Sequence, residues 1–498
     1  LTPALVSLVE VDLVMANGGQ IDTTQLQTLQ NGSVTADAVS VTLNALTNPT
    51  GSSFYAEAGG QISIPAITSY LGSSGSAHVE FRATDPGSRL NFASLNSVTG
   101  NTFTNSMLKI RAENGGVVDL SNVAVIPGGH TQITAAGANS LVDLTDLTLF
   151  VRSGRGDTYL EAVSNGHISA PSLTVMRGAG LYLNNTGVLE IPQLTEVSDA
   201  FIEATFTAPA LTTLTNINGS ELVARNGALI QLPSLTSYVG STAAVDTRFL
   251  ATGFNSTVSL PALTTLSGNT FANSELLIRA EGGGLVEIPA LPSITTGNTQ
   301  VEVEGSISHV DLSGLENFSR TTLGQSFVSV GSNATLSLAT TTTTFTDVDL
   351  AIANNAIVNA GELYLDTDAD LTAVGTLATD VVNNHVVTTG NSIALLNLAG
   401  DYTQLAGGSL RVDIRDDHPA VGFDRYTMTG NVSLAGTVRL VFTPGFTPQT
   451  GDSYNFLTID GTLAGQFTTV IIENLDNGLS VELTYTSDAV IAEIVSVP

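Results

Sequence analysis

One phrase of eight residues returns along this chain and constrains its fold more than any other feature. "SIPAITSY" (63–70), "QLPSLTSY" (231–238) and "SLPALTTL" (259–266) are three of its copies. With the residue at the Pro position taken as the anchor, the main copies are anchored at 65, 93, 121, 145, 171, 192, 209, 233, 261, 289 and 313. Two partial copies precede them, at Pro3 and Thr24. Repetition at a period of a few tens of residues indicates a solenoid.

Three apolar columns accompany the anchors, and Ile62, Ile67 and Tyr70 occupy them around Pro65. Residues before the anchor alternate between apolar and polar, which is typical of a strand. Proline then turns the chain, because it donates no backbone hydrogen bond. Short strands and corners in cycles of 17–28 residues predict an all-β fold, a right-handed parallel β-helix (β-solenoid), with the columns stacked inward.

A second, longer repeat is superimposed on the short one. Residues 65–150 align with 233–318 without a gap, which predicts an internal duplication. The phrase is no longer recognisable in full after about residue 320. From about residue 398, segments that alternate between apolar and polar residues, separated by Gly and Pro turns, replace it. We therefore expect a solenoid over 1–345, shorter irregular coils over 346–397, and a β-rich cap domain over 398–498, since an open ladder edge aggregates unless it is covered.

The composition excludes several partners and sites. Only 12% of the residues are charged, with 45 acidic against 15 basic, for a net charge of -30. Such a surface repels phosphate backbones and anionic headgroups, so nucleic acid and acidic membranes are not expected as partners. No apolar run reaches the roughly 18 residues of a membrane span. With no cysteine, neither disulfides nor thiolate metal sites can form.

"DTDAD" at 366–370 resembles the opening of a calcium loop. The sixth position is Leu371 rather than Gly and the twelfth is Leu377 rather than Glu, so it is not an EF-hand. On a strand, Asp366, Asp368 and Asp370 would share one face. Loose Ca²⁺ binding and a simple exposed acidic face are both open interpretations.

A second polar cluster is "DIRDDHPAVGFD" at 413–424. Asp416, Asp417 and His418 are its candidate metal ligands, because one histidine among carboxylates can bind a metal. The flanking Pro and Gly equally favour a turn with no bound ion. No other cofactor is expected.

Parallel β-helices often host polysaccharide lyases and hydrolases, which need clustered carboxylates, or Ca²⁺ with a base, in an aromatic groove. Here there is no Trp, Lys109 is the single lysine, and the acidic residues are spread singly along the coils, as at Asp119, Asp143 and Asp311. We therefore predict no catalytic residues and no enzymatic activity.

Within the phrase, a threonine often stands directly after the apolar residue two positions past the anchor. The β-propensity of threonine explains this column without any further function. A regular outward threonine ladder can also order water as an ice-binding surface. The members of this column are Thr68, Thr148, Thr174, Thr195, Thr212, Thr236 and Thr264.

The sequence at 400–457 includes "GDYTQLAGGSLRVDI" and "GFTPQTGDSYNFL". It resembles the C-terminal segment of the passenger domains of large exported bacterial β-strand-repeat surface proteins, which are similar to autotransporter-like adhesins. "EIVSVP" at 493–498 is similar to text that precedes a Pro-Glu-Pro C-terminal sorting signal. The resemblance implies a parallel β-helix secreted to, or held at, a bacterial cell surface.

These features favour an extracellular structural or adhesive protein, a rigid solenoid rod that forms surface or matrix material. "LTPALVSL" (1–8) is a clipped copy of the phrase. It is either the cut end of a longer chain or an open edge, and an open edge predicts self-association into head-to-tail filaments. A β-helix that binds or cleaves carbohydrate, with an extracellular polysaccharide as its partner, is the alternative hypothesis. An ice-binding surface is the third.

Overall fold

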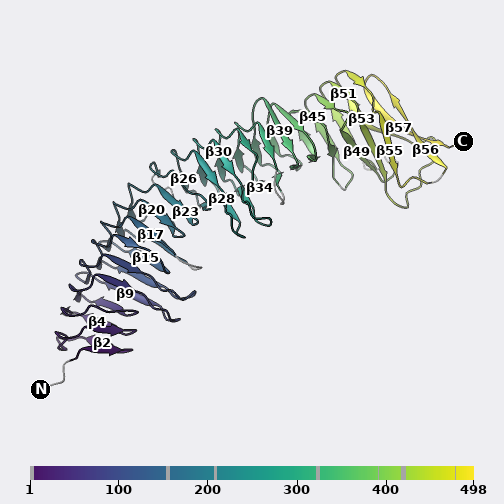
Figure 1. Cartoon of the computed structure of the whole chain (residues 1–498). Helices are drawn as coiled ribbons and strands as arrows, with labels where there is room; N and C mark the ends of the chain where they lie inside the picture. The colour runs from purple at the N-terminus through teal and green to yellow at the C-terminus, as the bar shows by residue number, and fades with distance from the viewer. Residues whose placement is uncertain are drawn as a thin grey trace. The chain divides into compact units, whose positions relative to one another are not determined.

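A computed structural model describes residues 5–152, 157–184, 186–206, 210–320, 326–390, 392–416, 422–476 and 478–497. These residues form 57 strands and no helix. Contacts divide the chain into two compact units, residues 1–235 and 236–498. Both units are stacks of parallel coils, which confirms the predicted all-β parallel solenoid (Figure 1).

In unit 1, most coils contribute one strand to each of three parallel sheets. The first sheet contains β2 (Asp12–Met15), β4 (Ser33–Asp37), β6 (Ser53–Glu57), β9 (Val79–Thr84), β12 (Leu108–Glu113), β15 (Thr131–Ala136), β18 (Tyr159–Val163), β21 (Gly180–Leu183), β24 (Phe201–Ala204) and β25 (Glu221–Arg225). The second contains β5 (Ser40–Thr42), β7 (Gln61–Ser63), β10 (Arg89–Asn91), β13 (Val117–Asp119), β16 (Leu141–Asp143), β19 (His167–Ser169) and β22 (Val188–Glu190). The third contains β8 (Ser69–Leu71), β11 (Ser97–Thr99), β14 (Val125–Ile126), β17 (Leu149–Val151), β20 (Val175–Arg177) and β23 (Glu196–Ser198). The remaining strands are the parallel pair β1 (Ser7–Val9) and β3 (Thr28–Gln30), and β26 (Leu229–Gln231).

Unit 2 repeats this arrangement. Its first sheet contains β28 (Thr247–Thr252), β31 (Leu276–Glu281), β34 (Thr299–Glu304), β37 (Phe327–Val330), β40 (Asp349–Ile352), β43 (Asp370–Ala373), β46 (Val386–Thr388), β49 (Ser409–Ile414), β52 (Thr437–Phe442) and β55 (Thr469–Glu473). The second contains β29 (Thr257–Ser259), β32 (Leu285–Glu287), β35 (His309–Asp311), β38 (Thr335–Ser337) and β41 (Ile357–Asn359). The third contains β27 (Ser237–Val239), β30 (Thr265–Ser267), β33 (Ser293–Ile294), β36 (Asn317–Ser319), β39 (Thr342–Thr346), β42 (Glu362–Leu365), β45 (Asp380–Asn383), β48 (Tyr402–Gln404), β51 (Val432–Leu434) and β54 (Leu463–Gly465).

The repeated phrase folds as a strand, a β-turn and a second strand. In the copy at Pro261, the Leu263 amide donates to the Leu260 carbonyl at 3.2 Å, so the proline occupies the second position of the turn. Proline favours this position because its φ is already set for it. Val258, Leu260, Leu263 and Leu266 are all buried, as expected for the inward columns.

The turn of one coil lies three residues later than its sequence anchor at 209. The Leu214 amide donates to the Leu211 carbonyl at 3.3 Å, so Thr212 holds the place of the proline. Leu214 and Ile217 then fill the inward columns, whereas Phe206, predicted to be inward, is 45% exposed. The assignment of this coil from its proline was therefore wrong, and Pro209 itself lies outside the described residues, as does Pro3.

A further coil, missed in the sequence, has its turn at Asn44, where the Leu46 amide donates to the Leu43 carbonyl at 3.3 Å. With both corrections, the turns at 24 and 44 are displaced from those at 192 and 212 by the same interval that separates Pro65 from Pro233. Ser52 and Ser220 show the same correspondence: each hydroxyl donates to a carbonyl of the preceding coil, at 2.9 and 3.0 Å. The duplicated block therefore spans 24–150 and 192–318.

Parallel coils continue beyond residue 397, where the cap was expected to begin. Their lengths vary, since Leu371 pairs with Val387 across a short coil, whereas Val438 pairs with Val470 across one about twice as long. Among the described strands, antiparallel pairing of strands occurs only at the end of a sheet that otherwise runs parallel. That sheet contains β44 (Gly375–Leu377), β47 (Leu395–Leu398), β50 (Arg425–Met428), β53 (Ser453–Ile459), β57 (Ala489–Ser496) and β56 (Leu479–Tyr485).

Ile307 provides a test of the repeat. It lies in a corner with φ of 59° and is 65% exposed, although a β-branched residue disfavours this left-handed conformation. Its counterpart in the first block is Asn139, with φ of 63°. We expect Ile307→Asn to raise the free energy of unfolding of unit 2 by about 1 kcal/mol, measured by urea denaturation. Asn139→Ile should lower the stability of unit 1 by a similar amount, and equal stabilities would contradict this account of the corner.

Candidate functional site

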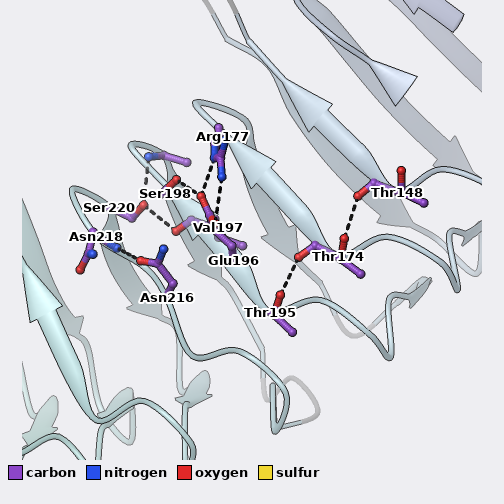
Figure 2. Close-up of polar contacts among 11 residues, drawn as sticks. Thr148, Thr174, Arg177, Thr195, Glu196, Val197, Ser198, Asn216, Asn218 and Ser220 are labelled. Atoms are coloured by element: carbon purple, nitrogen blue, oxygen red, sulfur yellow. Dashed lines mark hydrogen bonds and ion pairs between the residues drawn. The ribbon is translucent and has the colours of Figure 1, made fainter. Parts of the chain in front are cut away.

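The threonine column joins successive coils through its hydroxyl groups (Figure 2). Thr174 Oγ1 donates to the Thr148 carbonyl at 3.1 Å, and Thr195 Oγ1 donates to the Thr174 carbonyl at the same distance. Thr148 Oγ1 donates in turn to the Ala124 carbonyl at 3.0 Å. Each of these hydroxyl protons is therefore directed at the backbone of the preceding coil.

The corrected coil changes the membership of this column. Thr212, counted in it from the sequence, lies in a turn, and Thr215 occupies the position instead. Thr215 Oγ1 donates to the Thr195 carbonyl at 3.4 Å. The column is thus continuous from Thr148 to Thr215.

A polar cluster lies beside the column at the end of β23 (Figure 2). The Glu196 carboxylate accepts hydrogen bonds from Arg177 Nε at 2.6 Å and from Ser198 Oγ at 2.8 Å. The Arg177 hydrogen bond holds the pKa of Glu196 below its ordinary value. The carboxylate is therefore kept ionised and neutralised by its partner, which suits it to bracing a corner rather than to proton transfer.

The acidic residues that precede the turns also act on the backbone. Asp143 Oδ1 accepts the Thr145 amide at 3.1 Å and its hydroxyl at 2.6 Å. Asp311 Oδ1 accepts the Ser313 amide at 2.9 Å. This is the Asx-turn, in which a carboxylate mimics a backbone carbonyl. These side chains shape the corners of the coils.

The candidate calcium residues do not share one face of a strand, as the sequence suggested. The Ala369 amide donates to the Asp366 carbonyl at 3.2 Å, and Asp368 has φ of 54°, so 366–369 is a turn. Only Asp370 belongs to a strand, as the first residue of β43. The turn places Asp366 and Asp368 outside the strand that begins at Asp370, so the three carboxylates are not aligned on one strand face.

A histidine that the sequence interpretation did not single out links two of these carboxylates. His385 Nδ1 lies 2.7 Å from Asp370 Oδ1, and its Nε2 lies 3.3 Å from Asp368 Oδ1. Asp366 instead accepts Asn384 Nδ2 at 3.3 Å. Burial raises the pKa of Asp370 above its ordinary value. In the part of the chain that the structure describes, no group of three or more His, Asp and Glu side chains is arranged to hold a metal ion.

The third candidate cluster is described in part. Asp417 and His418 lie outside the described residues, and the Asp416 amide donates to the Gly422 carbonyl at 3.0 Å. Its most distinctive member is Asp424, which is fully buried. Asp424 Oδ1 accepts the Ala394 amide at 2.9 Å and Oδ2 accepts the Asp413 amide at 2.8 Å, while burial raises its pKa to about 6. The carboxylate joins two neighbouring segments of unit 2.

The chain matches no protein-family model and no curated protein. Among the described residues, no helix is long and apolar enough to cross a membrane.

Thr174 tests the role of the column. We expect Thr174→Val to lower the free energy of unfolding by about 1 kcal/mol or less, because it keeps the β-branched shape and removes one hydrogen bond. Thr174→Ser keeps the hydroxyl and serves as the matched variant. Urea denaturation measures the free energy of unfolding of both variants and the wild type. A valine variant as stable as the wild type would show that the Thr174 hydroxyl does not stabilise the coil.

Asp424 predicts a pH dependence. Its pKa in the folded state, about 6, exceeds its ordinary 3.8, so the folded protein binds a proton more readily between these values. The stability that this group contributes therefore rises as the pH falls through that window. Between about pH 7.5 and 4.5, the free energy of unfolding of the wild type should rise by about 2 kcal/mol relative to that of Asp424→Asn, whose side chain cannot ionise. Urea denaturation of both proteins at the two pH values measures this change. If the two proteins differed in free energy of unfolding by the same amount at both pH values, the raised pKa of Asp424 would be contradicted.

Proposed function

We propose that this protein is an extracellular structural and adhesive β-solenoid that associates with itself, similar to the exported passengers of bacterial surface proteins. The inward columns support this, because each added coil buries more apolar surface without any need for a convergent polar site. The resemblance at 400–457 supports a secreted or cell-surface location.

The observation that carries the proposal is the free edge of β55. This strand pairs with β52 on one side only among the described residues. Val470 and Ile471 on β55 are 38% and 41% exposed, respectively. A parallel edge strand with exposed apolar side chains is a template for strand addition by another chain. A second copy of this solenoid, which is made of parallel strands of similar length, is the partner we propose for it.

A non-enzymatic role agrees with how the polar groups are used. The threonine column, the Asx-turns and Asp424 each bond to the chain's own backbone, as shown above. Hydrogen-bonding capacity directed at neighbouring coils stabilises the fold and leaves those groups unavailable to a substrate. We therefore propose no catalytic step and no resident cofactor.

Ile471 provides the test. Its side chain faces outward, opposite Arg439 in the register, so Ile471→Lys should leave the coil folded and place a charge on the free edge. We expect the wild type to form concentration-dependent oligomers in sedimentation velocity, and Ile471→Lys to reduce their fraction several-fold. Ile471→Val is the matched control and should behave as the wild type.

Electron microscopy of the same samples shows whether the oligomers are filaments. A wild type that stays monomeric at every concentration and ionic strength would overturn the self-association. Equal association of the Lys and Val variants would show that another surface than β55 is responsible.

A further inference from the structure

A small hollow lies on the outer face of the first sheet of unit 1. Lys109 and Arg111 of β12, Gln132 and Thr134 of β15, and Tyr159 of β18 line it, and its volume is about 100 Å³. The register places Lys109 beside Gln132 and Gln132 beside Tyr159 in consecutive coils. These side chains face outward, because the buried residues between them point into the core.

The lining of the hollow is cationic. Lys109 is the single lysine of a chain with a net charge of -30, and it makes no ion pair within the described parts of the chain. Arg111 is balanced by Glu80 at 3.2 Å and Glu113 at 3.0 Å. Of the residues that the structure describes, no carboxylate lines the hollow itself. The carboxylates of Glu80 and Glu161 lie in neighbouring register positions, beside Lys109 and Thr134, rather than in the hollow. The Lys109 ammonium therefore suits the hollow to a small anionic group.

An aromatic surface adjoins the hollow. The rings of Tyr159 and Tyr182 have centroids 5.0 Å apart, and those of Tyr182 and Phe201 are 4.9 Å apart. Gly180 allows this arrangement: a Cβ there would lie 2.3 Å from Phe201 Cε1. Three partly exposed rings from consecutive coils thus gather on the outer face, although most outward positions in this chain are polar.

We propose that this surface binds a hexuronate residue of an acidic polysaccharide. Its carboxylate would enter the hollow toward Lys109, and the apolar C–H face of its pyranose ring would lie on Tyr159, with the Tyr182 ring at 84° to that of Tyr159 beside it. The volume of the hollow supports placing only the carboxylate inside it and the sugar ring outside. At about 100 Å³ it is well below the roughly 300 Å³ or more of a site that encloses a whole ligand. Tyrosine suits such a contact, since it offers an apolar face and a polar edge. This inference deepens the adhesive part of the proposed function and rests on it.

The second block and the strand that follows it, β37, provide a natural comparison. The positions equivalent to Lys109, Gln132 and Tyr159 are occupied there by Leu277, Gln300 and Phe327, in the same register. The ammonium and the phenolic hydroxyl are therefore absent from these three positions, while the strand register is the same. The double variant Lys109→Leu with Tyr159→Phe gives the first block the outer column of the second, so we expect it to fold.

Isothermal titration of the full chain with tetragalacturonic acid tests the proposal. We expect saturable binding to the wild type, weakened several-fold between about 50 and 300 mM NaCl because a charge contact contributes. The double variant should lose at least tenfold in affinity. Leu277→Ala, at the equivalent position of the second block, is the matched control and should bind as the wild type does. Circular dichroism confirms that each variant is folded.

A neutral tetrasaccharide of glucose, used under the same conditions, separates charge recognition from general sugar stacking. Equal affinity for the two sugars, or undiminished binding by the folded double variant, would overturn the proposal, as would an absence of uronate binding to the wild type. Ile471→Lys keeps this surface intact and should bind the uronate normally. Loss of self-association and loss of glycan binding are thereby distinguished.

Discussion

Hydrogen bonding between successive parallel coils is the constraint on which the rest of this structure depends. A strand inside one of the parallel sheets bonds in register to the strand one coil before it and to the strand one coil after it, so equivalent residues stack directly upon one another. A residue buried in one coil forces its neighbour in the next to be apolar and of compatible shape. One column shows this: Ile62, Leu90, Val118 and Val142 are all buried, and each pairs with the next across neighbouring strands.

The same constraint explains why the chain carries so few charges yet so much Ser, Thr and Asn. Corners must satisfy backbone groups that leave the ladder, and short polar side chains do so locally. The Thr148, Thr174 and Thr195 hydroxyls serve this purpose (Figure 2). The Asp143 carboxylate does so as well. Arginine occurs mainly where it neutralises a carboxylate of a neighbouring coil, as Arg279 does with Glu302 at 2.8 Å.

Much of the fold was predictable from the sequence because the columns repeat, and the errors have identifiable causes. The coil at Asn44 was missed because its turn contains no proline, although Leu43 and Leu46 occupy the expected positions. The coil at Thr212 was misplaced because Pro209, three residues earlier, was taken as the proline of its turn. His385 was missed because it is distant from Asp370 in the sequence, and only a coil shorter than any in the repeat brings the two side chains together.

Duplication separates what the fold requires from what it leaves free. Between the two blocks, the inward residues Ile110 and Ile278 are identical, and both are buried. The outward residues beside them are Lys109 in one block and Leu277 in the other. Because an outward side chain packs against no other coil's core, it can change without cost to the columns. We therefore expect specific recognition, including the binding proposed for the hollow beside Tyr159, at outward positions that differ between the two blocks.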